Sequence, residues 1–454
     1  MRRLPATGTV LVPTPNRAMA SAMSKAKPAA RHDPDPPGTP ARRAALRLLT
    51  SVLHQGRALD GSLDSALKRL DRSDDRALAR ALASGVLRWL TDLDALIDSA
   101  TPRPLPDDAR ARMALRIGMA GHLLLGTPPH AVVATTLALT EGGPRRLTHA
   151  VLSRLLREGA ALPEVPTLPA PFGDRWTSDW GADVALAAAR SFAHEPATDL
   201  TLRDATETAH WVKALGGVSL APGHVRIGRG GQVPDLPGFE AGAWWVQDLA
   251  ASVPARLLAV RAGETALDLC AAPGGKTLQL AAAGARVTAL DQSDARLDRV
   301  RENLARTGLA ATILAADALE WASAETFDAV LLDAPCSATG VFRRHPDVLH
   351  LKGSRDLTPV LELQSALLGR ALALLAPGGR LVFSTCSLDP REGEAQVEAL
   401  LARAPGVLRI DPVTPEELPV GIAPHARGWV RILPGDLEAA GGVDGFFIAR
   451  LRNG

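Results

Sequence analysis

The chain has 454 residues, room for about two to four domains, and its 46% apolar and 22% charged residues are typical of an ordinary soluble protein. No apolar run reaches the ~18 residues that a membrane-spanning helix needs, which argues against an integral membrane protein. The net charge is only +2, but residues 1–160 carry about +10 and the remainder about −8. This asymmetry indicates either a basic domain that binds an anion or an arginine-biased composition, and charge alone leaves both open.

The use of cysteine and histidine argues against a disulfide framework and against a metal site. The chain has three cysteines, Cys270, Cys336 and Cys386, an odd number with wide spacings. That pattern is typical of a protein in the reducing cytosol, so we expect a cytoplasmic location. The histidines, such as His345, lack the spacing of metal ligands, and no metal is predicted.

The first 40 residues are rich in proline, alanine and basic residues and show little apolar periodicity. This composition predicts a disordered tail over 1–40. Two alternatives are a transit peptide and a later start codon at Met19 or Met23. The segment has no apolar stretch long enough for a secretory signal.

Residues 41–160 are expected to be all-helical. The segments ARRAALRLLTSVLHQG, LARALASGVLRWLTDLDALIDSA, RARMALRIGMAGHLLLG and RLTHAVLSRLLREGA place apolar residues at helical spacing. Helices of this length with short connections predict a compact bundle. Its arginines form either a basic patch or an ordinary solvated surface. The arginines concerned are Arg42, Arg43, Arg47, Arg112, Arg116, Arg145 and Arg146.

Residues 161–240 have a mixed pattern. The stretch LPEVPTLPAPFG is a proline-rich linker, and GADVALAAARSFA after it has helical spacing. The pieces TDLTLRD and HVRIGRG indicate short strands. We therefore predict a small α+β segment after the linker.

From residue 241 to 454 the pattern alternates strand and helix. The predicted strands are TALDLCA, RVTALDQ, ATILAAD, AVLLDAP and GRLVFSTCS, separated by helical segments of about ten residues or more. Near-continuous apolar strands between helices predict a parallel sheet that is covered on both faces. FFIARL near the end is expected to add an antiparallel strand at one edge.

Polar or reactive residues stand at the end of each predicted strand. In open α/β sheets ligands bind beyond the carboxyl ends of the strands, so these residues are expected to lie along one edge. They are Asp268 with the loop from Cys270 to Lys276, then Asp291, then Asp317, then Asp333 with Pro335 and Cys336, and finally Cys386.

The loop within 267-LDLCAAPGGKTLQL-280 ends in Gly-Lys-Thr like a phosphate-binding P-loop, but Cys270 stands where that pattern requires glycine. Asp291, roughly 20 residues past this turn, suits the two hydroxyls of a ribose. Both Asp291 and Asp317 would repel a triphosphate. The pattern therefore favours a nucleoside ligand.

Two nucleotide-binding alternatives remain. In VLLDAP a run of apolar residues precedes Asp333, as in a Walker B strand. A P-loop ATPase is therefore the chief alternative to a nucleoside-binding protein. A dehydrogenase is less favoured, because the chain contains no G-x-G-x-x-G.

Four motifs together resemble the S-adenosylmethionine-dependent RNA cytosine-5 methyltransferase family: DLCAAPGGKT, DQSDARL, DAPCSATGVFRRHPD and STCSLDPREGE. WVQDLAASVPARLL before the first strand resembles that family as well, and the likeness covers about 215 residues. Residues 41–160 are similar to the NusB-like RNA-binding domain of one branch, the small-subunit (16S) ribosomal RNA methyltransferases of the Sun or Fmu type. The resemblance implies a NusB-like helical bundle, a small α+β RNA-recognition segment and a Rossmann-like methyltransferase domain.

The resemblance also implies an activity: methyl transfer from S-adenosylmethionine to carbon 5 of a cytosine in RNA, with 16S ribosomal RNA as the expected substrate. One alternative is the same chemistry on transfer RNA. Another is an RNA-binding assembly factor with an idle pocket, although two cysteines at neighbouring strand ends argue against idleness. The expected partners are RNA and cofactor, without membrane or metal, and the protein is expected to be a monomer.

Residue roles follow from the same resemblance. Cys386 would attack carbon 6 of the cytosine, Cys336 would assist release, and Asp333 would hydrogen-bond the ring nitrogen. Asp291 would bind the cofactor's ribose and Asp317 its adenine. The backbone around the methionine part would come from Cys270, Ala271, Ala272, Pro273, Gly274, Gly275 and Lys276. Lys276 is expected to contact either Asp333 or the RNA.

Several neighbouring residues have open roles. The Cys270 side chain is expected to be a small buried hydrophobe, and Asp268 either touches ligand or fixes the loop. Arg343 and Arg344 either contact phosphate or belong to a charged loop. The chain departs from the family pattern in DPREGE, where a carboxylate is kept at residue 392 and glycine replaces an amide at 393. A flipped base would reach the pocket most cheaply from single-stranded RNA, held by the basic N-terminal block and the middle segment.

Overall fold

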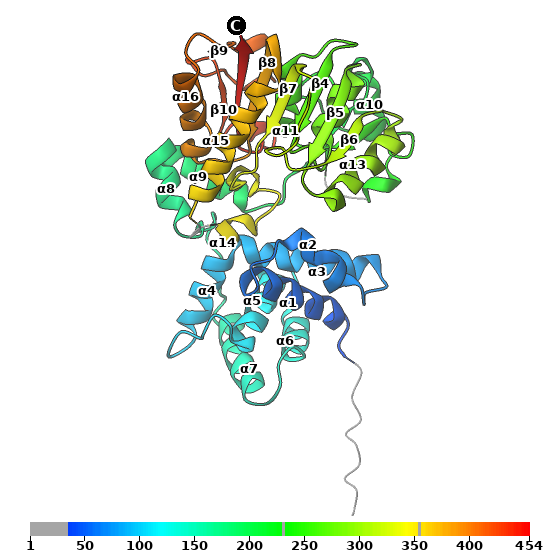
Figure 1. The fold of residues 1–454 in the computed structure, drawn as a ribbon. Helices are drawn as coiled ribbons and strands as arrows, with labels where there is room; N and C mark the ends of the chain where they lie inside the picture. Colours follow the sequence, from blue (N-terminus) through cyan, green and yellow to red (C-terminus); the bar gives the residue numbers. More distant parts are fainter. Residues whose placement is uncertain (1–34, 229–231, 353–355) are drawn as a thin grey trace, which may run out of the picture. The chain divides into compact units, whose positions relative to one another are not determined.

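The computed structural model of the protein describes residues 35–228, 232–352 and 356–454. Most of the predicted tail over 1–40 therefore lies outside the described residues. Contacts separate residues Met1–Asp35 from a compact unit, Pro36–Gly454, and the description below concerns that unit (Figure 1). Along its described ranges, none of the helices combines the length and the apolar character needed to traverse a lipid bilayer.

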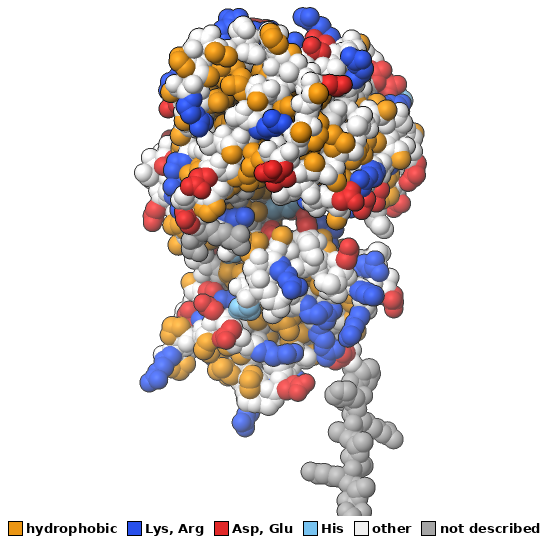
Figure 2. All heavy atoms as spheres, in the orientation of Figure 1, with side chains coloured by type: hydrophobic (Ala, Val, Ile, Leu, Met, Phe, Trp, Pro, Cys, Tyr) orange, Lys and Arg blue, Asp and Glu red, His pale blue; other side chains and the backbone are white. Residues whose placement is uncertain are grey.

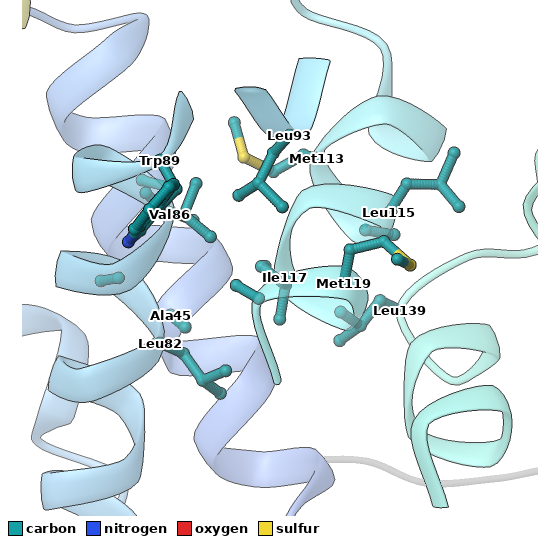
Figure 3. Packing of buried hydrophobic residues seen from close by; sticks show 14 of the residues in the cluster. Ala45, Leu82, Val86, Trp89, Leu93, Met113, Leu115, Ile117, Met119 and Leu139 are labelled. Carbon is teal, nitrogen blue, oxygen red and sulfur yellow. The ribbon is translucent and has the colours of Figure 1, made fainter. Parts of the chain in front are cut away.

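The first part of this unit is all-helical, as predicted. Its helices are α1 (Thr39–Leu53), α2 (Leu59–Leu67), α3 (Ser73–Arg88), α4 (Leu90–Ser99), α5 (Arg110–Leu123), α6 (Pro129–Leu137) and α7 (Gly142–Arg157). Figure 3 shows apolar side chains of α3 and α4, among them Leu82, Val86 and Leu93, facing Met113 and Ile117 of α5. Helix α5 is central to the bundle, because every residue from Ala111 to Gly121 is buried.

Two arginines that were candidates for a basic surface patch lie on this buried helix. Arg112 and Arg116 lie one turn apart on α5 and face α4, where they form ion pairs with Asp94 at 3.0 and 2.7 Å. Arg112 also pairs with Asp98 at 2.5 Å, and both arginine side chains are only 3% exposed. The prediction that these two belong to a surface patch is wrong, because α4 supplies carboxylates at the matching spacing. Arg42 is buried as well.

The middle part is α+β, as predicted. Helices α8 (Phe172–Trp180) and α9 (Ala182–Phe192) follow the proline-rich linker. The strands β1 (Thr198–Leu202), β2 (His224–Ile227) and β3 (Trp244–Val246) form an antiparallel sheet in the order β2-β1-β3, with α10 (Thr208–Leu215) between β1 and β2 in the chain.

The C-terminal part holds an eight-stranded sheet in the order β10-β11-β8-β7-β4-β5-β6, with β9 also paired to β11. Its strands are β4 (Thr265–Leu269), β5 (Arg286–Asp291), β6 (Thr312–Ala315), β7 (Phe327–Asp333), β8 (Leu375–Thr385), β9 (Leu408–Ile410), β10 (Val430–Ile432) and β11 (Phe446–Asn453). The five predicted strands, β4 to β8, are parallel.

The FFIARL strand, β11, is antiparallel to β8, as predicted. It is not an edge strand, however, because β9 and β10 pair with its other side. Those two strands are three residues each, too short to show a period in the sequence.

Both faces of the sheet are covered, because successive side chains of a strand point to opposite sides. On one face Leu267, Val330 and Phe383 pack with α15 (Thr358–Ala373) and α16 (Glu394–Arg403). On the other face Ala266 and Leu331 pack with α11 (Leu249–Leu258) and α12 (Gly275–Ala282). The remaining helices are α13 (Asp294–Thr307) and the short α14 (Val348–Lys352). A predicted α/β sheet with helices on both faces is thereby confirmed.

Candidate active site

A cavity of about 630 Å³ lies at the carboxyl ends of β4, β7 and β8. The strand register explains why these ends meet: Leu269 of β4 pairs with Leu332 of β7, and Asp333 pairs with Ser384 of β8. Of the residues expected at this edge of the sheet, those that line the cavity are Asp268, Asp333, Cys386, Cys270, Ala271, Ala272, Pro273, Gly275 and Lys276. The structure therefore brings these residues together at one cavity.

The loop after β4 owes its shape to two glycines. Gly274 has φ +103°, a left-handed conformation that glycine adopts without strain, and α12 begins directly after it. A Cβ at Gly275 would lie 3.2 Å from the side chain of Gln247. The loop backbone can therefore form the cavity wall closely, and a side chain at this position would disturb Gln247.

The Gly-Lys-Thr ending of this loop does not act as it does in a P-loop. The Thr277 hydroxyl donates a hydrogen bond to Asp268 at 2.6 Å, and both side chains are fully buried. Asp268 thus fixes the start of α12 to the end of β4, one of its two predicted roles. Burial raises the pKa of Asp268 to about 7. A threonine turned to an internal carboxylate is not available for a nucleotide-bound cation, which argues against the ATPase alternative.

Lys276 turns to the neighbouring strand instead. Its Nζ lies 2.6 Å from Asp333 Oδ2, and the Ser384 hydroxyl donates to Asp333 Oδ1 at 2.8 Å. Asp333 is therefore held on both oxygens while its side chain stays 31% exposed toward the cavity. Of the two contacts expected for Lys276, the one with Asp333 is present. Sequence reasoning missed Ser384, although it lies in the same STCS motif.

The two cysteines at the ends of β7 and β8 lie together. The Sγ atoms of Cys336 and Cys386 are 3.5 Å apart, and of the two only Cys386 lines the cavity. The hydrogen-bond contact with Cys386 and burial raise the pKa of Cys336 well above its usual value. Burial also raises the pKa of Cys270 to about 12, so that thiol stays neutral. Its side chain is partly buried and packs against the apolar core on one face of the sheet.

The two residues predicted to bind ribose and adenine, Asp291 and Asp317, do not line this cavity. Asp291 is 2% exposed, and its carboxylate accepts hydrogen bonds from the backbone N–H groups of Ala272 at 3.2 Å and Ser293 at 3.0 Å. Asp317 is exposed and accepts from the N–H of Leu319 at 2.9 Å. Asp291 thus ties the tip of β5 to the loop, and the cofactor contacts of both residues stay predictions.

The two arginines of the VFRRHPD motif have different surroundings. Arg343 is 4% exposed and lies between Asp248 at 3.7 Å and Asp444 at 3.4 Å. The prediction of a phosphate contact for Arg343 is wrong, because these carboxylates enclose it. Arg344 pairs with Asp444 at 2.5 Å, is 34% exposed and lines the cavity. Arg344 therefore remains a candidate for phosphate contact.

The helical part carries a second, basic cavity. It has a volume of about 450 Å³, and its lining includes Arg43, Arg47, Arg57 and Arg110 but no acidic residue. Burial and the charges of Arg69 and Arg43 lower the pKa of Arg47. Figure 2 shows Lys and Arg side chains gathered on the face of the helical part that carries α1 to α3. Such crowding of like charge would be relieved by an anion.

The described residues offer no obvious place for a metal ion. Within residues 35–228, 232–352 and 356–454, no group of three or more His, Cys, Asp or Glu side chains is arranged to hold one.

Comparison with known families gives two matches that follow the two main parts of the chain. Residues 255–452 match the family described as 16S rRNA methyltransferase RsmB/F, and residues 39–156 match the NusB family. The resemblance to a ribosomal RNA methyltransferase with a NusB-like domain is thereby confirmed.

Several bacterial proteins named ribosomal RNA small subunit methyltransferase B are similar to nearly the whole chain. That of Xylella fastidiosa strain Temecula1 is 38% identical, and the match covers 91% of this chain and 98% of that protein. That of Xanthomonas campestris pv. campestris is 36% identical, with 91% and 97% covered. That of Pseudomonas putida is 35% identical, with 90% and 98% covered.

Solved structures share the fold. The crystal structure of PH0851 gives a TM-score of 0.72 at 21% identity and covers 91% of this chain and 98% of that one. A methyltransferase homologue from Pyrococcus horikoshii gives 0.51 at 27% identity, covering 66% and 98%. The relatives named ribosomal RNA small subunit methyltransferase B are 36% and 38% identical to this chain over 91% of its length. The chain therefore belongs to the RsmB/F family of 16S rRNA methyltransferases.

Proposed function

We propose that the protein methylates carbon 5 of a cytosine in 16S ribosomal RNA, with Cys386 as the attacking thiol. The observation that carries this proposal is the arrangement at one cavity wall. Cys386 lines that wall with the Sγ of Cys336 3.5 Å from its own, and the 2.6 Å pair of Lys276 and Asp333 lines the same cavity. The relatives support 16S ribosomal RNA as the substrate, because they are named as methyltransferases of small-subunit ribosomal RNA.

The chemistry needs a nucleophile because carbon 5 of cytosine is itself poorly nucleophilic. Attack by the Cys386 thiolate forms a bond between sulfur and carbon 6, and carbon 5 then becomes enamine-like and can accept a methyl group. The proton on carbon 5 is afterwards lost to water as the carbon–sulfur bond breaks, which restores the ring double bond and returns Cys386 to its thiolate form. Cys336, in contact with Cys386, would assist this release.

Negative charge builds up on the ring when sulfur attacks. The ring nitrogen would take up a proton as the sulfur attacks and donate a hydrogen bond to the Asp333 carboxylate. Lys276 would stabilise the remaining negative charge, because its ammonium group lies 2.6 Å from the same carboxyl. A cation in a partly buried site is more effective than one in water, since it is already oriented and little screened. The Ser384 hydroxyl, which donates to Asp333 at 2.8 Å, keeps that side chain in one orientation.

The family depends on S-adenosylmethionine, which supplies the methyl group when bound. The residues present fit such a ligand: about 630 Å³ is within the usual range of small-molecule sites, and no side chain of residue 275 intrudes on the wall. The backbone of residues 270–276 would hold the methionine part. Asp291 and Asp317 would hold ribose and adenine from the tips of β5 and β6.

RNA would be held at two places. The helical part's arginine-lined cavity would bind phosphates away from the reacting base, because it lacks any acidic lining residue. Arg344, on the wall of the catalytic cavity, would contact a phosphate close to the target cytosine. The domains proposed are a NusB-like RNA-binding bundle over 41–160, an RNA-recognition segment over 161–240 and a methyltransferase domain over 241–454.

The test uses Cys336→Ala and Cys386→Ala proteins, each mixed with S-adenosylmethionine and 16S RNA from a strain that lacks the enzyme. Denaturing gel electrophoresis should show a protein–RNA adduct with Cys336→Ala alone, and mapping its RNA identifies the base. If neither variant forms an adduct while wild type methylates that RNA, the cysteine roles are wrong. Methylation of transfer RNA but not 16S RNA would favour the alternative substrate, and binding without methylation of either would favour an idle pocket.

A further inference from the structure

Glu392 is a buried carboxylate that the proposed chemistry does not use. It ends the 3-10 turn Pro390–Glu392 after β8, and its side chain is fully buried. Among the described residues it has no ion pair with Lys, Arg or His. A buried charge without a cation is costly unless hydrogen bonds satisfy it, so its presence requires an explanation.

Four donors satisfy this carboxylate. Oε1 accepts from the Ser337 backbone N–H at 2.8 Å and from Gln364 Nε2 at 3.2 Å. Oε2 accepts from the Ser337 hydroxyl at 2.5 Å and from the Ser387 hydroxyl. These bonds use the full acceptor capacity of an ionised carboxylate, about four lone-pair sites. Neither a glutamine nor a hydrocarbon side chain could accept all four.

The donors come from the two loops that carry the cysteines. Ser337 directly follows Cys336, and Ser387 directly follows Cys386. The same two loops are joined by a backbone bond from Gly340 N–H to the Cys386 carbonyl at 2.8 Å. A further bond runs from Leu388 N–H to the Thr339 hydroxyl at 3.0 Å. Glu392 therefore links two loops that leave different strands, one residue away from each thiol.

We propose that Glu392 is a positioning residue that holds Cys336 against Cys386. This inference rests on the proposed function, since it deepens the account of how the two cysteines cooperate. A fixed spacing places Cys336 next to the carbon–sulfur bond that must break. A neutral Cys336 leaves Cys386 as the only thiol of the pair that is free to attack.

The charge of Glu392 acts on Cys336 in the direction this role requires. Its negative charge adds to the contact with Cys386 and to burial, all of which raise the pKa of Cys336. Cys386 at the end of β8 and Glu392 are the titratable groups with the largest effects on Cys336, and the N–H of Ala338 acts in the opposite direction. Removing the charge should therefore make Cys336 easier to ionise.

The kinetic test compares Glu392→Gln and Glu392→Asp with wild type. Glu392→Gln should lower kcat for methyl transfer by roughly 10- to 100-fold with KM for RNA nearly unchanged. It should also accumulate the covalent RNA adduct, because release is impaired more than attack. Glu392→Asp keeps the charge and should recover part of kcat. The matched control is Glu398→Gln, which makes the same substitution at an exposed residue of α16, the helix that follows Glu392 in the chain. It should behave as wild type.

A second measurement does not depend on methylation. In a Cys386→Ala background, the pH dependence of Cys336 alkylation by iodoacetamide, read by mass spectrometry, should move to lower pH when Glu392→Gln is added. If folded Glu392→Gln protein keeps wild-type kcat, adduct level and alkylation profile, Glu392 is not a positioning residue. Should Glu392→Gln fail to fold, Ser337→Ala and Ser387→Ala each remove one hydroxyl that donates to Glu392 and should give smaller changes of the same kind. Wild-type behaviour of both would overturn the inference.

The two proposals can fail separately. A Cys336→Ala protein that forms no adduct, while the alkylation profile still shifts with Glu392→Gln, would overturn the cysteine roles and leave the effect of Glu392 on Cys336 intact.

Discussion

The Sγ atoms of Cys336 and Cys386 lie 3.5 Å apart, although 50 residues separate them in the chain. Their contact follows from the parallel pairing of β7 and β8, whose register runs to Asp333 beside Ser384. Because the ladder continues to the last residues of both strands, the two loops leave the sheet side by side. The pair therefore depends on the order of strands in the sheet and not on either motif by itself.

Replacing Lys276 should impair catalysis more than folding. Lys276→Met removes the ammonium group 2.6 Å from Asp333 while keeping most of the apolar stem, and kcat should fall by roughly 10²–10³-fold, as when one preorganised electrostatic group is lost. Single-turnover methyl transfer with labelled S-adenosylmethionine measures this. Lys276→Arg keeps the charge and is the control; equal activity of Lys276→Met and wild type would remove Lys276 from the mechanism.

Adding a methyl group at residue 275 should weaken cofactor binding. In Gly275→Ala the new Cβ would meet the Gln247 side chain at 3.2 Å. Gln247 would have to move by a few tenths of an ångström, which strains its hydrogen bonds with Trp245 and Gln279, and we expect Kd for S-adenosylmethionine to rise by roughly tenfold, about 1.4 kcal/mol. Isothermal titration calorimetry gives this Kd.

A matched substitution controls for a general effect of alanine. Gly369→Ala lies in α15 with open space around its Cβ position and should leave the Kd unchanged while stabilising the helix slightly. An unchanged Kd in Gly275→Ala would show that the loop does not contact the cofactor as closely as proposed.

The two neighbouring arginines of VFRRHPD should differ in what they lose. Arg343→Ala leaves Asp248 without its ion pair, whereas Asp444 keeps Arg344 at 2.5 Å, and we expect a loss of about 1–3 kcal/mol of unfolding free energy with no change in the salt dependence of RNA binding. Arg344→Ala removes the closer ion pair of the buried Asp444 and should cost stability as well, but it alone should weaken RNA binding and reduce the slope of log K against log salt by about 1, as for one lost phosphate contact. Denaturant titration and filter binding at several salt concentrations separate these effects, and an unchanged salt slope for Arg344→Ala would exclude a phosphate contact.

The buried Asp268 should make stability depend on pH in a defined direction. Its pKa is raised from 3.8 to about 7 in the folded protein, chiefly by burial. Between these values the folded state holds a proton that the unfolded state has lost, so this group makes unfolding easier as pH rises from about 4 to 7. Asp268→Asn removes that titration, and its oxygen can still accept from Thr277.

The expected result is that the difference in Tm, Asp268→Asn minus wild type, becomes more positive between pH 4 and pH 8. The linkage is worth up to ~4 kcal/mol, from ~1.4 kcal/mol for each pKa unit. Calorimetry at both pH values measures it. A difference that is independent of pH would mean that Asp268 ionises at its ordinary pKa in the folded protein.

Much of the fold could be predicted because its signals are local. Helical spacing marked α1, α3 with α4, α5 and α7 of the bundle but not the nine-residue helices α2 and α6, and near-continuous apolar strands marked β4 to β8 as a covered parallel sheet. Short strands with no period escaped prediction, which is why β11 was placed at an edge although β9 and β10 flank it.

Side-chain surroundings were harder to predict than elements. Arginine is usually a surface residue, yet Arg116 and Arg343 are buried in ion pairs, Arg116 with Asp94 and Arg343 with Asp444. A charged residue in a sequence carries no sign of the partner that a distant segment will supply. Ser384 was missed for a similar reason, since its role depends on lying beside Asp333.

By itself the sequence determined which groups reach the carboxyl edge of the sheet, because strand ends and the residues that follow them are local features. It placed Asp333, Cys336 and Cys386 at the ends of two strands and the glycine loop after a third. Only the tertiary structure decided which of these groups touch. The order β8-β7-β4 brings two thiols within 3.5 Å, pairs Lys276 with Asp333 and joins both cysteine loops through Glu392. Those contacts depend on which strands are neighbours, and hydrophobic packing of the whole sheet sets that order rather than any stretch of chain within it.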